Sequence, residues 1–418
     1  MGLLNGSFFM FGSAFLDPST VLPVFVKRFT DSDFIVGLAG SLQRAGWHLP
    51  QLPLAGYVER RAYKLPIYLK ANVVRMTLML AFLPALAYWA ADRPTLVLAS
   101  FLFLFGLSAL FGGAAGLPFT ELVGKTIPPR LRGPFYAIRF FFGAGLLSIS
   151  AGFIVKHILE SDAYPFPSNY LWIFGIALSL MIVGIVSYAF VKEAPSVVNP
   201  TRRRWRDVLA EIPGILERDA NYRNLILSRL LVSGIGFSLP FYVVLARERF
   251  GVPEGATGIF LAAQTLGATL SNLPFGWLSA RKGNRIVIRL SAAAIAVVPL
   301  YTIGLLAAQN VAHNSGSELA NPTWLFLPIF LLIGGAMTGN FVGYNSLLLD
   351  IAPEDRRPTY IGITNTAMGA ASLFPAVGGL IADLMGLEVT FVLASVAVVA
   401  GLVSTGRIKG GPAEGNAG

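Results

Sequence analysis

The chain has 418 residues, of which 55% are hydrophobic and only 13% are charged. Charged residues make up about 25% of an ordinary soluble protein, so this composition cannot cover the surface of a water-soluble globule. It is also too apolar for a disordered chain. The absence of cysteine excludes disulfides, thiolate metal sites and a cysteine nucleophile. The composition therefore indicates a protein embedded in a lipid bilayer.

Twelve apolar segments are long enough to cross a bilayer as α-helices, which takes about 18 or more residues. Seven of them contain a stretch without Asp, Glu, Lys or Arg: 94–120, 163–191, 255–280, 290–317, 319–349, 358–382 and 389–406. The stretch 290–317 belongs to the ninth span, which is placed at about 286–309. Five more contain one or two ionisable residues: 3–26, 34–58, 65–90, 134–157 and 224–246. None shows the two-residue alternation of barrel strands. The predicted fold class is an all-α polytopic membrane protein with twelve transmembrane helices.

The net charge of +10 is concentrated on one side of the predicted bundle. Most Lys and Arg residues lie in the connections after spans 2, 4, 6, 8 and 10 or in the C-terminal tail. Because such an excess marks the cytoplasmic side, we expect a multi-pass protein of the cell (inner) membrane with both termini cytoplasmic. The distribution argues against a nucleic-acid partner. The first span lacks a basic leader and a cleavage site, so we expect a retained helix rather than a signal peptide.

The longest connection, residues 193–222, is polar at first and then amphipathic. Trp205, Val208, Leu209 and Ile212 follow helical spacing beside several arginines, which predicts a short basic helix on the inner leaflet, although a plain linker is also consistent. The predicted domains are an N-terminal six-helix bundle (1–192), this cytoplasmic linker (193–222), a C-terminal six-helix bundle (223–407) and a flexible cytoplasmic tail (408–418).

The two halves of the chain repeat one another. At an offset of 221 residues, identical residues are paired at Gly37/Gly258, Gln43/Gln264, Gly46/Gly267, Leu49/Leu270, Leu52/Leu273 and Pro53/Pro274. At an offset of 224, the segment from Ile127 to Tyr136 matches that from Ile351 to Tyr360 in its Ile, Pro, Arg and Tyr residues. Equivalent spans lie six apart and run in the same direction, so the repeat is parallel. Two similar halves can rock about a central site, which favours transport over a passive anchor.

The loop after span 8 carries a motif that strengthens this interpretation. It reads GWLSARKGNR from Gly276 to Arg285, and the loop after span 2 carries a weaker copy, AGYVERRAYK, from Ala55 to Lys64. Both loops resemble the Gly-x-x-x-Asp-Arg-x-Gly-Arg-Arg/Lys motif of the major facilitator superfamily. The copy after span 2 replaces both glycines by alanine and the acid by Glu59, and the copy after span 8 has Ala280 in place of the acid. The resemblance covers nearly all of the chain and implies that superfamily's fold.

By this resemblance, the motif loops form the cytoplasmic gate of a rocker-switch transporter. Acids that end spans 4 and 10 and the basic residues that follow them can form ion pairs in one state and break them in the other; an exposed pair contributes only about 0–1 kcal/mol. The alternative is that these charges only end the helices and fix the topology. The candidate gate residues are Glu59, Arg60, Lys64, Glu121, Arg132, Gly276, Arg281, Gly283, Arg285, Asp350 and Arg356.

Two opposite charges are predicted deep in the membrane. Asp17 lies nine residues before Val26, where span 1 leaves the bilayer, and Arg44 lies ten residues after Phe34, where span 2 enters from the same side. At 1.5 Å per residue, both are about 14–15 Å deep. A charge there costs about 2.5–3.5 kcal/mol. Arg44 could hold an anionic substrate group, Asp17 could exchange a proton, the two could switch partners between states, or they could form a permanent structural ion pair.

Other polar residues inside spans extend this candidate site. His48 and Gln51 share a helical face with Arg44. In the second half, Gln264, Asn340 and Asn365 lie well inside their spans, where they either line a cavity or form hydrogen bonds between helices. Arg75 is the deepest of the basic residues near the cytoplasmic ends, and it either reaches to the interface or faces the bundle interior.

The sequence thus predicts a secondary active transporter that moves a small organic solute across the membrane by alternating access, coupled to protons. The alternative is a lipid flippase or membrane assembly factor with the same fold. No nucleotide, metal-binding or Ser-His-Asp motif is present, so we expect no catalytic site, no metal site and no cofactor apart from a coupling proton. The expected partners are a small-molecule substrate and the lipid bilayer, and by family resemblance the protein is a monomer.

Overall fold

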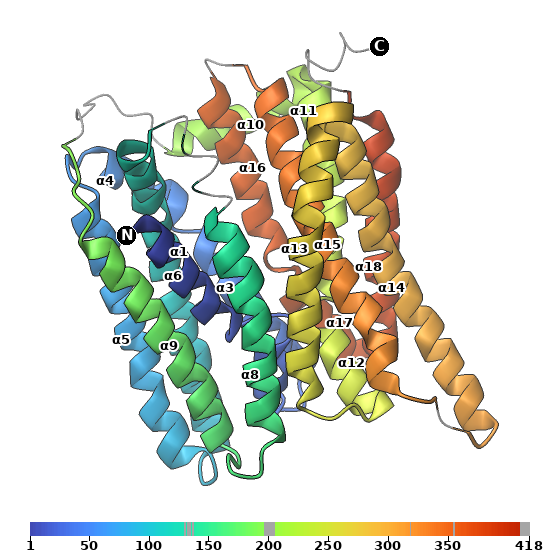
Figure 1. Ribbon diagram of the computed structural model, residues 1–418. Helices are drawn as coiled ribbons and strands as arrows, with labels where there is room; N and C mark the ends of the chain where they lie inside the picture. Colours follow the sequence, from blue (N-terminus) through green and yellow to red (C-terminus); the bar gives the residue numbers. More distant parts are fainter. Residues whose placement is uncertain are drawn as a thin grey trace. The chain divides into compact units, whose positions relative to one another are not determined.

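The computed structural model describes residues 1–128, 131, 135, 138–195, 205–317, 319–353 and 356–409. Within this part, all regular structure is helical (Figure 1). Among the described residues, nine helices or joined helices are long and apolar enough to cross a membrane: α5 (Leu65–Trp89), α6 (Pro94–Thr126), η1 with α8 (Phe140–Glu160), α9 (Ser168–Ala189), α11 through α12 (Ala220–Phe250), α14 (Asn284–Asn314), α15 (Pro322–Ile351), Thr359–Met385 within α16 and α17, and α18 with η4 (Leu387–Arg407). The all-α polytopic membrane class is confirmed.

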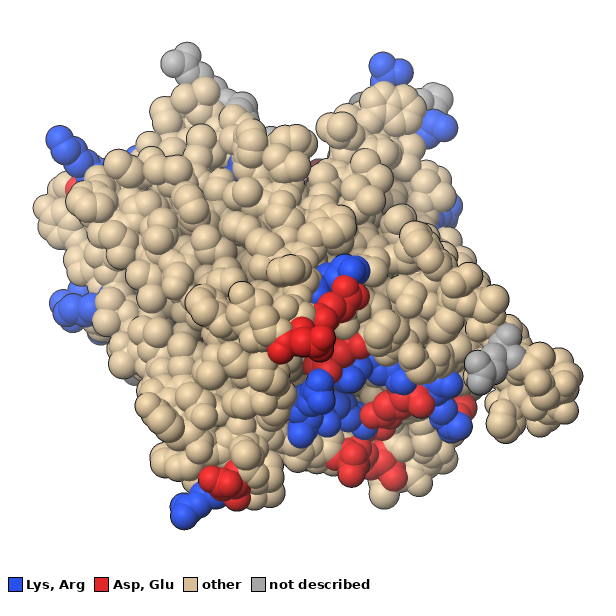
Figure 2. Space-filling model, turned by 60° about the horizontal axis from the view of Figure 1, so that its bottom comes forward, with Lys and Arg blue, Asp and Glu red and all other residues tan. Residues whose placement is uncertain are grey.

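The other three predicted spans are also helical but fall outside that criterion. They are α1 (Gly2–Ala14) with α2 (Val21–Val26), α3 (Asp33–His48) with α4 (Gln51–Glu59), and α13 (Ala256–Lys282). Much of the protein surface is uncharged: in the face shown by Figure 2, most acidic and basic side chains gather in one part, a few more lie at the rim, and most of the rest is tan. An uncharged surface of this kind suits contact with lipid.

The first span of each repeat half is interrupted, which the sequence analysis did not predict. Span 1 breaks between Ala14 and Val21, where Pro18 lacks a backbone N–H to continue the helix. The equivalent span breaks after α11 (Ala220–Val232) into the 3₁₀ segment η2 (Ser233–Phe237) and then α12 (Phe241–Phe250). Interrupted spans free backbone polar groups within the membrane, and in transporters such groups often line a binding site.

Proline and glycine also divide other predicted spans. The second span turns at Leu49–Pro50 between α3 and α4, and the eleventh turns at Ser372–Leu373 between α16 (Arg357–Ala371) and α17 (Phe374–Met385). The fifth contains a π-helical segment, η1 (Phe140–Leu147), before α8 (Ser148–Glu160). The predicted spans are therefore present but are not uniformly α-helical at these three places.

The chain divides into two compact units. The first contains residues 1–31, 38–204 and 253–262, and the second contains 32–37, 205–252 and 263–418. In the first unit, α1 packs on α9 and α5 packs on α6. Its centre is an aromatic cluster around the fully buried Phe25, whose ring lies 5.0 Å from Phe101, 4.9 Å from Phe174 and 5.0 Å from Tyr170.

In the second unit, α14 packs on α15, and α18 (Leu387–Ser404) packs on both α11 and α14. The amphipathic helix of the linker forms as α10 (Trp205–Arg218), and Ile215 is buried with Tyr222 in the core of this unit. Ile212 also packs there, so this part of α10 covers protein. The side chains of Trp205, Val208 and Leu209 lie outside the described part.

The structured part of the chain continues beyond the predicted bundle boundary at residue 407. Ile408 is 1% exposed within the core of the second unit. The backbone N–H of Lys409 donates to the Asn221 side chain at 2.7 Å, and the carbonyl of Lys409 accepts from the same side chain at 3.2 Å. The predicted flexible tail from residue 408 therefore starts too early, since its first two residues are fixed against α11. Residues 410–418 lie outside the described part.

Glycine allows two equivalent pairs of helices to touch. A Cβ at Gly46 of α3 would lie 2.5 Å from the Ala109 side chain of α6, and a Cβ at Gly113 would lie 2.3 Å from the Gly46 oxygen. In the second unit, a Cβ at Gly334 of α15 would lie 1.8 Å from the Gln264 oxygen of α13. Gly113 and Gly334 differ by the same 221 positions as Gly46 and Gly267. The repeat seen in the sequence therefore extends to the packing of the helices.

The first turns of α3 and α13 also have equivalent surroundings. Residues 32–37 belong to the second unit, where Asp383 accepts hydrogen bonds from Ser32 Oγ (2.6 Å), Asp33 N (2.6 Å) and Phe34 N (3.1 Å). Such a carboxylate caps the N-terminus of a helix. Residues 253–262 belong to the first unit, where Glu254 accepts from Arg28 and from the Tyr170 hydroxyl at 2.7 Å. Both helix starts are held by a carboxylate in place of a flexible loop.

Candidate functional site

A cavity of about 310 Å³ lies inside the first unit and is lined by α1, α3, α5, α6 and α9. Its polar lining is Ser13, Gln43, Arg44, His48, Arg75 and Ser108. Its apolar lining includes three methionines (Met76, Met79 and Met181), three aromatic residues (Phe9, Trp47 and Phe105) and Leu178. Cavities of about 300–1,000 Å³ with a mostly apolar wall and a few polar groups are typical of small-molecule sites. This cavity is the candidate functional site.

Arg44 lies on α3 and is half-buried at the cavity wall. The negative charge of Asp17 is close enough to act on its guanidinium. Asp17 itself does not line the cavity, although its neighbour Leu16 does. Arg44 therefore lines the cavity, while Asp17 lies outside the lining and acts on Arg44 through its charge.

Asp17 also stabilises the interruption of the first span. Its Oδ1 accepts hydrogen bonds from Ser19 N (2.9 Å), Ser19 Oγ (2.7 Å) and Thr20 Oγ1 (2.9 Å). Thr20 immediately precedes α2. This arrangement is a local side-chain cap of the kind that Asp forms where a helix begins. Asp17 thus has a structural role in the turn in addition to its charge beside Arg44.

Arg75 faces the bundle interior, which settles one of the two alternatives left by the sequence. Its guanidinium carbon lies 5.2 Å from the centroid of the Phe9 ring, a cation–π distance. A Cβ at Gly112 of α6 would lie 3.1 Å from the same carbon, so the glycine leaves the space that the guanidinium occupies. Arg75 is thus the second guanidinium in the cavity wall.

The other predicted substrate residues are placed in different surroundings. His48 lines the cavity, whereas Gln51 does not and donates from Nε2 to the Trp47 carbonyl at 2.9 Å. Gln264, Asn340 and Asn365 belong to the second unit and are not part of this cavity. Asn365 is exposed, and Asn340 Oδ1 is buried with no hydrogen-bond partner among the described residues.

Gln43 was not predicted as a site residue from the sequence, although its repeat partner Gln264 was. Gln43 lies on α3 and contributes to the cavity wall, and its Oε1 is buried without a hydrogen-bond partner in the described part of the chain. Its spacing of one residue from Arg44 places it off the polar face of Arg44 and His48, which explains why helical periodicity did not find it.

The candidate gate residues form ion pairs and hydrogen bonds inside each unit. In the first unit, Lys64 is 1% exposed, lies 3.2 Å from Glu121 at the end of span 4 and donates to the Val58 carbonyl. In the second unit, Asp350 accepts from Asn284, the first residue of α14, at 2.7 Å. Each acid therefore holds the start of another helix of its own unit.

The remaining gate candidates contribute in different ways. Arg281 lies over the Trp277 ring at 5.1 Å, and Gly283 precedes α14 with a φ of +83°, which favours glycine. Arg285 Nε is buried with no hydrogen-bond partner among the described residues. Gly276 lies within α13, and Arg60 and Arg356 are exposed. Arg132 and the side chain of Glu59 lie outside the described part.

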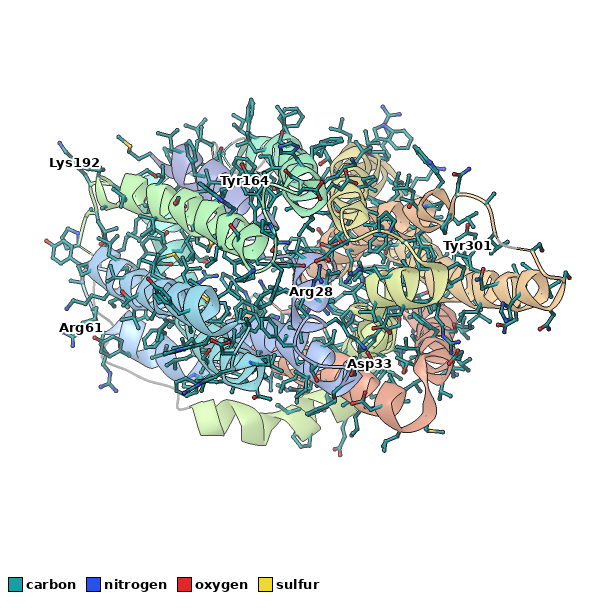
Figure 3. The ribbon with its side chains drawn as sticks, turned by 90° about the horizontal axis from the view of Figure 1, so that it is seen from below. Arg28, Asp33, Arg61, Tyr164, Lys192 and Tyr301 are labelled. Atoms are coloured by element: carbon teal, nitrogen blue, oxygen red, sulfur yellow. The ribbon has the colours of Figure 1, made fainter. Side chains whose placement is uncertain are left out.

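Glu193 is a further buried acid that the sequence analysis did not single out. Its side chain is 3% exposed and accepts from Lys125 Nζ at 2.6 Å and from the backbone N–H groups of Lys64 (2.7 Å) and Leu65 (2.8 Å) at the start of α5. Burial would raise the pKa of Glu193, but the hydrogen bonds from Lys125, Leu65 and Lys64 outweigh it and lower the pKa below its ordinary value. Its neighbour Lys192 lies at the same edge of the first unit as Arg61 (Figure 3).

Comparisons with solved structures agree with this fold. The chain superposes on a D-xylose-proton symporter with a TM-score of 0.71 over 96% of this chain and 95% of that chain, at 14% identity. It superposes on the nucleoside transporter NupG with a TM-score of 0.70 over 98% of this chain and 100% of that one, also at 14% identity. The chain is therefore an integral membrane protein with the fold of these transporters.

The sequence comparisons match part of the chain to a known family. Residues 224–412 match the Major Facilitator Superfamily model. The multidrug resistance protein MdtG of Citrobacter koseri is 32% identical over 197 residues, and MdtG of Escherichia coli O6:K15:H31 is 31% identical over 192 residues. The C-terminal half of the chain therefore matches the major facilitator superfamily, the family that the motif loops resemble. These alignments cover 44% and 42% of this chain and 43% and 42% of the two relatives, so the chain matches less than half of their length.

Proposed function

We propose that the protein is a secondary active transporter, which moves a small organic solute across the cytoplasmic membrane by rocker-switch alternating access and couples it to protons. The observation that supports this most directly is the cavity around Arg44. A cation half-buried in an apolar helix bundle is energetically expensive, and it is therefore a functional hypothesis by default. The relatives named as symporters and resistance proteins support the same class.

Asp17 is the proposed proton site. It is half-buried at the interruption of the first span, and its charge acts on Arg44. A proton on Asp17 removes the negative charge beside Arg44, so the guanidinium becomes free to interact with a solute. Occupancy of the site by proton and by solute is then linked, because each changes the electrostatic energy of the other.

The proposed arrangement in the membrane follows the distribution of basic residues. Both termini face the cytoplasm, and the protein acts as a monomer. The Lys64–Glu121 and Asn284–Asp350 contacts then lie at the cytoplasmic ends of their helices, where they fix the loops of the gate. No cofactor other than the coupling proton is required.

The proposed function is tested by flux in proteoliposomes. The purified full chain is reconstituted with an entrapped pH-sensitive dye, a pH gradient is imposed, and solutes from a panel of small organic anions, cations and neutral molecules are added in turn. We expect at least one solute to move protons in the parent protein and not in empty liposomes or in Asp17→Asn. Solute uptake that is equal with and without the gradient would contradict proton coupling. Movement of a fluorescent phospholipid without movement of any solute would instead support a flippase.

A further inference from the structure

The charged lining of the cavity is of one sign. Among its lining residues, the ionisable side chains are Arg44, Arg75 and His48, and none is acidic. No hydrogen bond or ion pair joins either guanidinium to another residue of the described part, apart from the longer-range attraction of Asp17 for Arg44. A cation half-buried in an apolar helix bundle is stabilised when a counter-charge accompanies it.

We propose that the solute is an organic anion, whose anionic group binds to Arg44 and Arg75 together while its apolar part lies against the methionines of the cavity; this rests on the proposed function. A guanidinium carries five N–H donors in a planar fork that matches carboxylate, sulfonate or phosphonate oxygens. Two such forks on different helices, α3 and α5, can grip one anionic group from two directions.

The surroundings of Arg75 show that it is held ready for a ligand. The Phe9 ring supports one face of its guanidinium at 5.2 Å, and Gly112 leaves room beside it. The ring contact leaves the N–H groups at the edge of the guanidinium available, since a cation–π contact uses the face. Asp17 cannot serve as the counter-ion of both arginines, because it lies outside the cavity lining and its Oδ1 is engaged by Ser19 and Thr20.

The rest of the cavity sets the size and character of the ligand. Its volume of about 310 Å³ is roughly twice that of a cavity that holds benzene. It therefore has room for an aromatic or branched apolar group in addition to the anionic group. Met76, Met79 and Met181 provide polarisable, flexible walls that adapt to different shapes. The expected solutes are amphipathic organic monoanions and not sugars or cations.

Ligand binding to the purified full chain in detergent tests this inference independently of transport. The ligands are 2-naphthoate, 4-phenylbutyrate and 1-octanesulfonate, each compared with its uncharged amide or sulfonamide and with an alkylammonium of the same size. Thermal stabilisation and quenching of Trp47 fluorescence report binding, because Trp47 lines the cavity. We expect the anions to raise Tm and to quench fluorescence, with the quench absent in Trp47→Phe. Equal stabilisation by the neutral or cationic partners, or by none of the compounds, overturns the proposal.

Variants of the arginines provide the second part of the experiment. Arg75→Gln and Arg44→Gln should each raise the half-saturating concentration of the anions about tenfold or more, since a charge-assisted hydrogen-bond pair is lost. Arg75→Lys keeps the charge without the fork and should give an intermediate value. Arg61→Gln is the matched control, because Arg61 is exposed and lies over Tyr57 outside this cavity. Unchanged anion affinity in folded Arg75→Gln overturns the role of Arg75. If the anions fail while another solute still drives proton flux, the proposed function stands and this inference falls.

Discussion

Gly113 of α6 lies directly against Gly46 of α3: a Cβ added at Gly113 would lie 2.3 Å from the Gly46 carbonyl oxygen. This contact brings α3 close to α6 and so sets the distance between two walls of the cavity that contains Arg44. In the second unit, the repeat partner of Gly113, Gly334, holds α15 against the Gln264 carbonyl of α13. The close approach of helices in both units depends on the absence of side chains at these positions.

We predict that Gly113→Ala destabilises the protein. The added Cβ meets backbone atoms, which cannot move as a flexible side chain can, and overpacking of this kind costs about 1–3 kcal/mol. Gly124→Ala in the same helix is the control, because a Cβ there meets nothing within 4 Å. It should leave Tm unchanged or raise it slightly, since alanine favours a helix by about 0.5–1 kcal/mol over glycine. Equal thermal unfolding curves for the two variants would show that α3 and α6 are not in close contact.

Asp17→Asn and Asp17→Ala should separate the two roles of Asp17. The hydrogen bonds from Ser19 and Thr20 end on Oδ1, which Asn keeps and Ala removes. We expect Asp17→Ala to lower stability by about 0.5–2 kcal/mol, as for the loss of a helix cap, and Asp17→Asn to unfold close to the parent. Both variants should lose proton coupling. Full pH-driven flux in Asp17→Asn would restrict Asp17 to its structural role.

The loss of folding stability at acid pH should depend on Glu193. Its folded-state pKa is lowered, so its contribution to stability is complete above its unfolded value of about 4.5 and is lost as the pH falls through the lower folded-state pKa. Glu193→Gln should therefore unfold at a lower temperature than the parent at about pH 6, with the difference shrinking below about pH 4.5. Glu160→Gln, at an exposed pair with Lys156, is the control and should show little difference. A constant gap between Glu193→Gln and the parent over this range would argue against the lowered pKa.

The gate assignment predicts a loss of transport rate without loss of fold. Glu121→Gln removes the partner of Lys64, and Asp350→Asn removes the charge that accepts from Asn284 while keeping an amide oxygen there. We expect both variants to reduce the turnover of the proton-linked solute and to leave the half-saturating concentration nearly unchanged, because neither residue lines the cavity. Flux measured over a range of solute concentrations separates the two parameters. Turnover equal to that of the parent in both folded variants would show that these charges only end the helices and fix the topology.

The sequence predicted the helical class and the repeat because both depend on patterns that are summed over many residues. Apolar runs of about 18 residues and the parallel offset of 221 survive small local errors. The depth of Arg44 in the membrane stays a prediction, which rests on distance along a helix being proportional to residue number. Its position in the cavity wall agrees with that reasoning.

The breaks and the composition of the site were harder to predict. Pro18 and Pro50 interrupt helices, whereas Pro84 lies inside the continuous α5, so proline alone does not locate a break. Which face of α5 turns inward depends on its packing against α6, which explains why Arg75 was left between two alternatives. The role of Glu193 depends on contact with α5, more than a hundred residues earlier in the chain, and no local pattern reveals it.

The most direct test of the central claim is proton flux driven by a solute in proteoliposomes that contain the parent, Arg44→Gln or Arg61→Gln at equal protein density. Arg44 lines the cavity, and Arg61 is an exposed arginine of the same unit. We predict that the parent and Arg61→Gln move protons at similar rates in response to the solute, and that folded Arg44→Gln loses most of this response. Equal flux in all three would contradict the assignment of the cavity as the solute site.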